Sequence, residues 1–161
     1  MKNTTKRILT AALAIVIIAA MALTIVSCGG KTTYTYKSSS VKVLLDGKDV
    51  TSLYSETAEP MAKNTEAEYK NTTATASGSE VVLEKSGEKT TIKVTKQDGK
   101  LVPTAGSMDV AKSLSQINSV TGGTIDMYFV QEGSTLTMVI TVNVTTTGQT
   151  VSYSEEVVFS K

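Results

Sequence analysis

Three side chains in the later part of the sequence are the strongest candidates for binding chemistry: Tyr128, Tyr153 and Glu155. Tyr153 and Glu155 share the parity of Val151 and Val157, so a regular strand would point both toward one interior. An inward carboxyl beside a tyrosine hydroxyl can anchor the polar head of a ligand, or act as a general acid if its pKa is raised. These residues form the predicted ligand-binding site.

The adjacent acids Glu155 and Glu156 allow a second interpretation. A β-bulge at this pair, or a position at the mouth of a barrel, would turn both carboxylates to water. The sequence favours this second interpretation. The tyrosines are likewise interpreted first as partial core fillers, because two phenylalanines and no tryptophan are left to fill a core.

Other chemistry is poorly represented. Asp46 and Asp49 lie close together, but Ca²⁺ needs six to eight oxygen ligands, so the pair indicates a solvated turn. The chain has no histidine and no Ser-x-x-Lys motif, and these absences remove the usual ways of activating a nucleophile. We therefore predict no catalytic residues, no metal and no cofactor, and we expect that the protein is not an enzyme.

The first 28 residues predict that the protein is targeted to a membrane. Lys2, Lys6 and Arg7 precede the uncharged apolar run Ile8–Val26, a pattern typical of a secretory signal or of a membrane anchor. Either way, the basic end stays in the cytoplasm and the rest of the chain is extracytoplasmic. The chain carries 16 basic and 15 acidic residues, a formal charge of +1 that predicts no nucleic-acid partner.

The segment Ile25-Val26-Ser27-Cys28 resembles the lipobox of bacterial lipoproteins. The resemblance implies that Cys28 is acylated and that cleavage occurs just before it, so that the protein is anchored to the cell membrane, or to an outer membrane if the host has two. The predicted organisation is a signal peptide over residues 1–27, an acylated cysteine and short tether over 28–40, and one β domain over 32–161. The alternative is that Cys28 is a chance thiol at the end of a transmembrane helix.

Strands must position the candidate site. The clearest strand has a period of two, and its inward residues are Leu136, Met138, Ile140, Val142 and Val144. Similar runs precede and follow it, with turns at Glu132-Gly133 and Thr147-Gly148, which predicts an antiparallel meander. Further strands are expected at 34–45, 81–84, 92–95 and 101–102, with a weaker one within 66–75. The turns expected between them are Asp46-Gly47, Ser86-Gly87 and Asp98-Gly99.

Helical spacing predicts one short helix over 108–118 and allows another within 51–64, where Pro60 would have to lie at the helix start or in a loop. The predicted fold is therefore mainly β, with about seven or eight strands and one or two short helices. An up-and-down barrel and a two-layer β-sandwich both fit. The final hairpins favour the barrel, because closure removes exposed strand edges.

This order, with an opening Tyr34-x-Tyr36 strand that leads into Asp46-Gly47, resembles the lipocalin-like domains of bacterial lipoproteins. The Gly-x-Trp motif of lipocalins is absent, since the chain has no tryptophan. The resemblance implies a barrel that binds a small apolar or amphipathic ligand. The alternative is a structural or interaction module of the cell envelope that recognises a protein or glycan and encloses no ligand.

Overall fold

The computed structural model describes residues 31–104, 107 and 123–161, and this part of the chain is mainly β. All of its strands are antiparallel and belong to one sheet. The strands are β1 (Thr32–Leu45), β2 (Lys48–Asp49), β3 (Thr72–Ala76), β4 (Glu80–Lys85), β5 (Glu88–Gln97), β6 (Lys100–Pro103), β7 (Thr124–Glu132), β8 (Thr135–Thr146) and β9 (Gln149–Ser160). The predicted fold class is confirmed.

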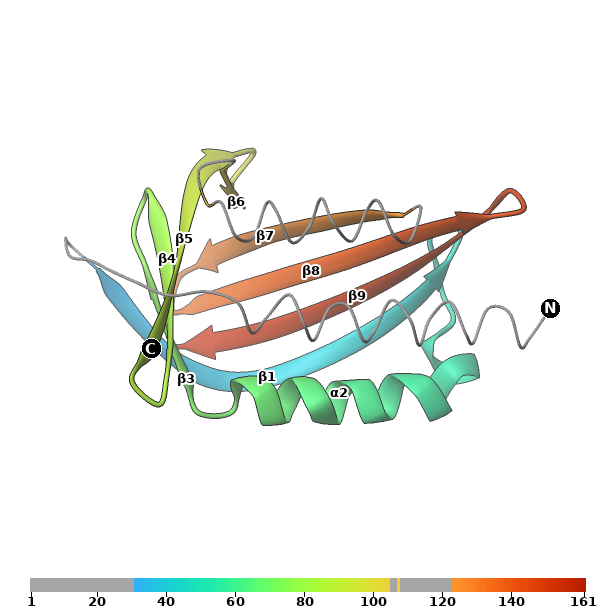
Figure 1. Ribbon diagram of the computed structural model, residues 1–161, viewed down its shortest axis with the longest axis horizontal. Coiled ribbons are helices and arrows are strands. Elements are labelled where there is room, and N and C mark those ends of the chain that lie inside the picture. Colours follow the sequence, from blue (N-terminus) through green and yellow to red (C-terminus); the bar gives the residue numbers. More distant parts are fainter. Residues whose placement is uncertain (1–30, 105–106, 108–122) are drawn as a thin grey trace.

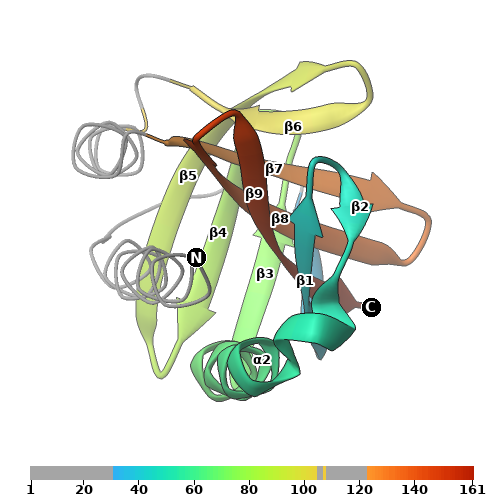
Figure 2. The same ribbon diagram turned by 90° about the vertical axis from the view of Figure 1, so that its right-hand side faces the viewer.

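Eight of these strands close into a ring. The sheet order is β2-β1-β3-β4-β5-β6-β7-β8-β9, and β1 pairs with β9 as well as with β3. Figure 1 shows β1, β9, β8 and β7 running side by side as long strands, with β3, β4 and β5 crossing them at one end. The view along the long axis in Figure 2 shows the strands wrapping around a common interior. The architecture is thus a barrel-like meander, with the short β2 outside the ring.

Tight turns join the hairpins as the sequence predicts. At Asp46-Gly47, Ser86-Gly87, Asp98-Gly99 and Thr147-Gly148, both residues have positive φ, between 48° and 86°. Two consecutive residues of positive φ match the twist of the flanking strands, and glycine adopts this conformation at little cost. The chain therefore specifies these four connections locally.

Strand β1 begins earlier than expected. The polar run predicted as a tether up to residue 40 is strand from Thr32 onward, because its backbone pairs with β3 and then with β9. A register shift between Tyr36 and Ser38 lets the strand change its direction where it leaves β3 and follows β9. Residues 1–30, which include Cys28 and the predicted signal peptide over 1–27, lie outside the described residues.

The helix allowed within residues 51–64 is longer in the structure than the sequence predicts. The 3-10 turn η1 (Thr51–Tyr54) leads into α2 (Ser55–Tyr69), and Pro60 lies inside this helix rather than at its start. The apolar contacts of Ala58 and Met61 with the sheet offset the hydrogen bond that proline cannot donate. Because α2 extends to Tyr69, residues 66–69 are helical. The weak strand expected within 66–75 begins only at Thr72, as β3. The helix predicted over 108–118 lies outside the described residues.

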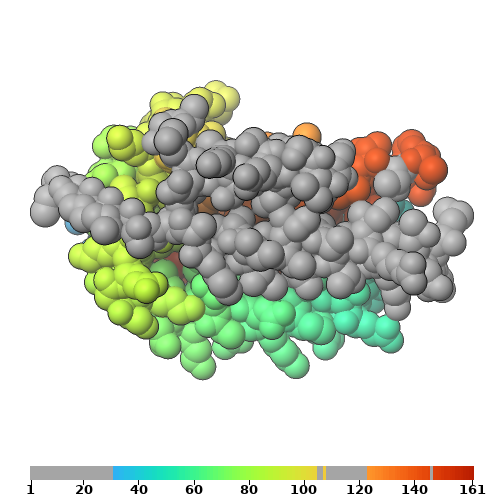
Figure 3. Space-filling model, viewed as in Figure 1, coloured from blue at the N-terminus to red at the C-terminus, as the bar shows by residue number. Residues whose placement is uncertain are grey.

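Helix α2 runs along β1. Figure 1 shows the two elements side by side, and in Figure 3 the helix forms one edge of the face in view. It contacts β1 and, to a smaller extent, β9. Within the described ranges, no helix is both long and apolar enough to cross a bilayer.

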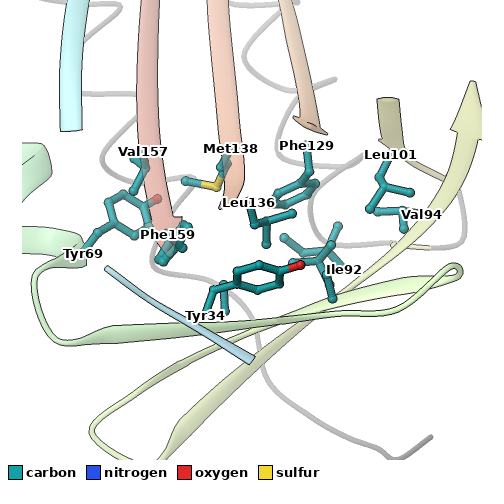
Figure 4. Close-up of a cluster of buried hydrophobic side chains, with 13 residues drawn as sticks. Tyr34, Tyr69, Ile92, Val94, Leu101, Phe129, Leu136, Met138, Val157 and Phe159 are labelled. Carbon is teal, nitrogen blue, oxygen red and sulfur yellow. The ribbon is translucent and has the colours of Figure 1, made fainter. Parts of the chain in front are cut away.

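The interior holds two apolar clusters. The cluster within the ring contains Tyr34, Phe129, Leu136 and Phe159, all with 0% exposure. Figure 4 shows their side chains converging from β1, β7, β8 and β9. The second cluster lies between α2 and the far part of the long strands, and its buried members are Val41, Val43, Ala58, Met61, Ile125, Val142, Val144 and Tyr153. Side chains from all four long strands thus fill the ring at one end and meet α2 at the other.

Candidate functional site

The candidate site centres on one row of residues across the inner face of the long strands. Met127 on β7 pairs with Ile140 on β8, Ile140 pairs with Glu155 on β9, and Glu155 pairs with Val41 on β1. We call these four residues the Glu155 row. Ile140 packs against both apolar clusters, so this row lies where the two clusters meet.

Glu155 lies inside the protein, with 6% of its surface exposed. The pairing of β9 with both neighbours continues without a shift through residues 155 and 156. The expected bulge is therefore wrong, and regular alternation places Glu155 inward and Glu156 outward. Continuous hydrogen bonding to two strands explains this outcome, because a bulge would break the ladder on both sides. Outside, Glu156 Oε1 accepts a hydrogen bond from Lys42 Nζ at 3.1 Å.

Helix α2 brings further polar groups to Glu155. The hydroxyl of Thr65 lies close enough to the carboxyl of Glu155 to affect its pKa, and the charge of Glu68 acts on the same carboxyl. Tyr69 lies in the last turn of the helix, close enough for the charges of Glu155 and Glu68 to raise the pKa of its hydroxyl. In Figure 4, Tyr69 lies beside Val157 of β9. The site is thus built by β9 on one side and α2 on the other.

Burial controls the protonation of this cluster. Desolvation raises the pKa of Glu155 above its ordinary value, and the charge of Glu68 adds to the rise. The hydroxyl of Thr65 acts in the opposite direction when it donates its hydrogen to the carboxylate. However, that hydroxyl also donates to the Met61 carbonyl oxygen at 3.0 Å, and it has only one hydrogen. The opposing effect is therefore weak, and burial dominates.

The two tyrosine hydroxyls of the cluster remain neutral. Desolvation raises the pKa of both Tyr69 and Tyr153, and the charge of Glu155 raises each of them further. Neither phenol can therefore act as a base near neutral pH. Both can exchange hydrogen bonds with a ligand, since a phenol is a donor and an acceptor.

Tyr153 has an unusual environment. Its side chain is 4% exposed, and its hydroxyl has no hydrogen-bond partner within residues 31–104, 107 and 123–161. A buried hydroxyl without a partner costs roughly 1–3 kcal/mol of stability. Tyr153 lies two positions before Glu155 on the same face of β9, so the unsatisfied hydroxyl and the buried carboxyl belong to one site.

Met127 and Ile140 differ in burial from the residues of the adjoining rows. In the neighbouring rows the side chains of Phe129, Met138 and Val157 on one side, and of Ile125, Val142 and Tyr153 on the other, are buried. By contrast, Met127 and Ile140 remain only partly buried. The two neighbours of Glu155 on β7 and β8 are therefore less buried than the residues of the adjoining rows.

The structure separates Tyr128 from the other two predicted site residues. Tyr128 has the opposite parity to Met127 and lies on the outer face of β7, opposite Val139 of β8. There, Lys100 Nζ sits 4.1 Å from the centre of its ring in a cation–π contact. The predicted trio is thereby reduced to Tyr153 and Glu155.

The acids of the first turn form local hydrogen bonds. Asp49 Oδ1 accepts from the backbone nitrogen of Thr51 at 2.9 Å and from its hydroxyl at 2.6 Å, and these bonds hold the pKa of Asp49 below its usual value. Asp46 Oδ1 accepts from the backbone nitrogen of Thr150 at 2.8 Å. Within the described ranges no group of three metal-ligating side chains occurs.

The contributions of Thr65 and Glu68 were not predicted from the sequence. Glu68 falls within the segment 66–75 that was expected to hold a weak strand, although Ala58, Met61, Thr65 and Tyr69 follow each other at intervals of three and four residues. That spacing indicates one helix face, and it could have identified the buried side of α2.

No family model, curated protein or solved structure matches this chain.

Proposed function

We propose that this protein is a lipid-anchored, extracytoplasmic binding protein whose β domain holds a small amphipathic molecule at the Glu155 row. The observation that carries this proposal is the buried carboxyl of Glu155 beside the unsatisfied hydroxyl of Tyr153. A domain that only had to fold would gain stability by replacing both groups with apolar ones. A ligand with a polar head satisfies both groups and gives a physical reason to keep them.

The ring and the Glu155 row have different parts in this proposal. Tyr34, Phe129 and Phe159 fill the ring, so the ligand is not held at that end in the manner of a hollow lipocalin-like barrel. Met127 and Ile140 of the row are only partly buried and would contact the apolar part of the ligand. The proposed role is binding rather than catalysis.

Binding is tested with an environment-sensitive fluorescent lipid. We expect saturable fluorescence enhancement, competition by unlabelled amphiphiles, and weaker binding in Glu155→Gln than in Glu156→Gln. Native mass spectrometry of protein purified from its own source should show a retained small molecule. If the probe does not saturate and the purified protein has the mass of the polypeptide and its acyl groups alone, the ligand-binding proposal is wrong.

Anchoring through Cys28 forms the second part of the proposal, and its support comes from the lipobox-like segment. Lys31 is tied to the start of β4 by an ion pair between its Nζ and Glu80 Oε1 at 2.7 Å. The three residue steps from Cys28 to Lys31 span at most about 10 Å. An acyl group on Cys28 would therefore hold the domain close to the lipid surface, with the start of β1 and the β3–β4 turn nearest to it.

Anchoring is tested by labelling with radioactive palmitate and by cell fractionation. The protein should incorporate the label and sediment with membranes, and Cys28→Ala should abolish the label. Since Cys28 is the only cysteine, no other thiol can replace it. An unmodified Cys28 in membrane-bound protein would contradict lipidation and favour a transmembrane anchor.

The second candidate function is an interaction module of the cell envelope. The filled ring favours it, because a solid barrel presents only its outer surface and loops to a partner. In that case the fluorescent lipid should not bind, and the Glu155→Gln substitution should leave all interactions of the protein unchanged.

A further inference from the structure

We infer that the ligand of the Glu155 row is a cationic amphiphile: a primary amine head, protonated when bound, on an apolar body. This inference rests on the proposed binding function and adds the chemical class of the ligand. It follows from the kinds of hydrogen-bonding groups that meet at the row and from the sign of their charge.

The interior is acidic and has no buried cation to balance it. Among the residues that the structure describes, Glu155 is the one buried side chain with a carboxyl or amino group, and every lysine is exposed or half-buried. Glu68 adds a second carboxylate at the helix side of the site, where Lys85 Nζ lies 3.4 Å from its Oε1. An ammonium group would form an ion pair with the Glu155 carboxylate, whereas the carboxylate of a fatty acid would find no buried cation among the described residues to pair with.

The polar groups at the Glu155 row are also suited to a ligand that donates hydrogen bonds. The carboxylate of Glu155 accepts hydrogen bonds, and the oxygen of Tyr153 can accept one. Because Thr65 donates its hydrogen to the Met61 carbonyl oxygen, its own oxygen is left as an acceptor too. These three acceptors match the three donors of a primary ammonium group.

The apolar body has a matching surface. Met127 and Ile140 extend the same row away from Glu155 and are only partly buried. Methionine adapts its unbranched side chain to different apolar shapes. An alkyl chain lying over these two residues would place its head group at Glu155.

Binding has a defined proton balance. At a pH below its raised pKa the carboxyl of Glu155 holds a proton, and an ammonium ion that binds there displaces this proton to solvent and leaves a carboxylate–ammonium pair. Tyr69 and Tyr153 remain neutral, Glu68 faces the pair from α2, and β8 and β1 contribute only Ile140 and Val41 to this row. Affinity for an amine should therefore rise with pH up to the raised pKa of Glu155, and it should fall at the higher pH where the amine loses its charge.

The test uses the full chain, purified with its own N-terminus and held in nanodiscs of a zwitterionic phospholipid. Octylamine, octanol and octanoate are titrated in turn by isothermal calorimetry, with empty nanodiscs as the blank. We expect saturable octylamine binding that is at least about tenfold tighter than octanoate binding. Titrations at a pH below the raised pKa of Glu155, in two buffers of different ionisation enthalpy, should show proton release when the amine binds.

Two variants and a matched control identify the residues. Glu155→Gln should weaken octylamine binding by about tenfold or more and abolish the proton release. Tyr153→Phe keeps the carboxyl, removes an unsatisfied hydroxyl and should weaken binding by a smaller factor. Glu156→Gln makes the same charge change on the outer face and should leave the affinity unchanged.

The outcomes separate this inference from the function on which it rests. If octanoate or octanol binds saturably and at least as tightly as octylamine, the domain binds amphiphiles but the amine inference is overturned. Octylamine binding that Glu155→Gln does not alter also overturns it. If none of the three ligands binds saturably, both the inference and the ligand-binding proposal are wrong.

Discussion

Glu155 and Glu156 are neighbours in the chain and lie on opposite faces of β9. Glu155 is enclosed between the strand and α2, where it meets Thr65, while Glu156 pairs with Lys42 outside. The same chemical group therefore experiences two environments within one dipeptide. This contrast provides a matched pair of substitutions for measuring what a carboxyl costs in this interior.

Replacing Glu155 with glutamine should remove a pH dependence of stability. Burial raises the native pKa of Glu155 above the ordinary 4.5, so the native state keeps a proton that the unfolded state loses as the pH rises past that value. Unfolding free energy should consequently fall between pH 4.5 and the raised native pKa, by about 1.4 kcal/mol for each unit of the shift. Glu155→Gln should not show this fall.

Urea unfolding, followed by circular dichroism at several pH values from acid to mildly alkaline, measures this difference. Glu156→Gln serves as the control and should shift stability by less than about 1 kcal/mol, since its ion pair with Lys42 is largely exposed. Parallel pH profiles for the wild type and Glu155→Gln would show that the carboxyl of Glu155 is solvated in the native state.

Gly87→Ala should destabilise the protein by about 1–2 kcal/mol, although no atom lies within 4 Å of the added carbon. The cost comes from the backbone, because Gly87 has a φ of +86° in the turn between β4 and β5. Gly78→Ala is the control: its position is equally open, and its φ lies outside the left-handed region. Thermal unfolding of the two variants compares them, and equal melting temperatures would rule out backbone strain at Gly87.

Tyr34→Phe should cost about 1 kcal/mol through a single hydrogen bond. Gln131 Nε2 of β7 donates to the hydroxyl of Tyr34 on β1 at 2.8 Å, and these two strands are not neighbours in the sheet. A double-mutant cycle with Gln131→Ala isolates the pair. Additive effects of the two substitutions would mean that this link across the ring contributes nothing to stability.

Phe129→Ala should lower the unfolding free energy by about 3–5 kcal/mol, because its ring is fully enclosed within the filled end of the barrel. Leu53→Ala is the control, since Leu53 is 78% exposed and its loss should change stability by less than about 0.5 kcal/mol. Chemical denaturation measures both. A cost below about 1 kcal/mol for Phe129→Ala would mean that this end is loosely packed and open to a ligand.

Local patterns predicted much of the fold. The alternation from Leu136 to Val144 placed their side chains inward, and dipeptides such as Asp98-Gly99 marked turns whose conformation depends on two residues alone. A period of two and a positive φ are properties of neighbouring residues, and they persist whatever the rest of the chain does. The same parity allowed Tyr153 and Glu155 to point inward, although the sequence favoured a bulge or a barrel-mouth position for Glu155.

The remaining features depended on contacts between distant segments. Thr35 of β1 pairs with Ser160 of β9, and this closure made the two-sided ladder that excludes a bulge at Glu155. Docking on the sheet stabilised α2 through Pro60 and brought Thr65 to Glu155, against the weak local preference of that segment. Local sequence therefore determined the alternation of side chains along each strand. The tertiary structure decided which of them meet, because ring closure and helix docking are paid for by burial that only the assembled chain provides.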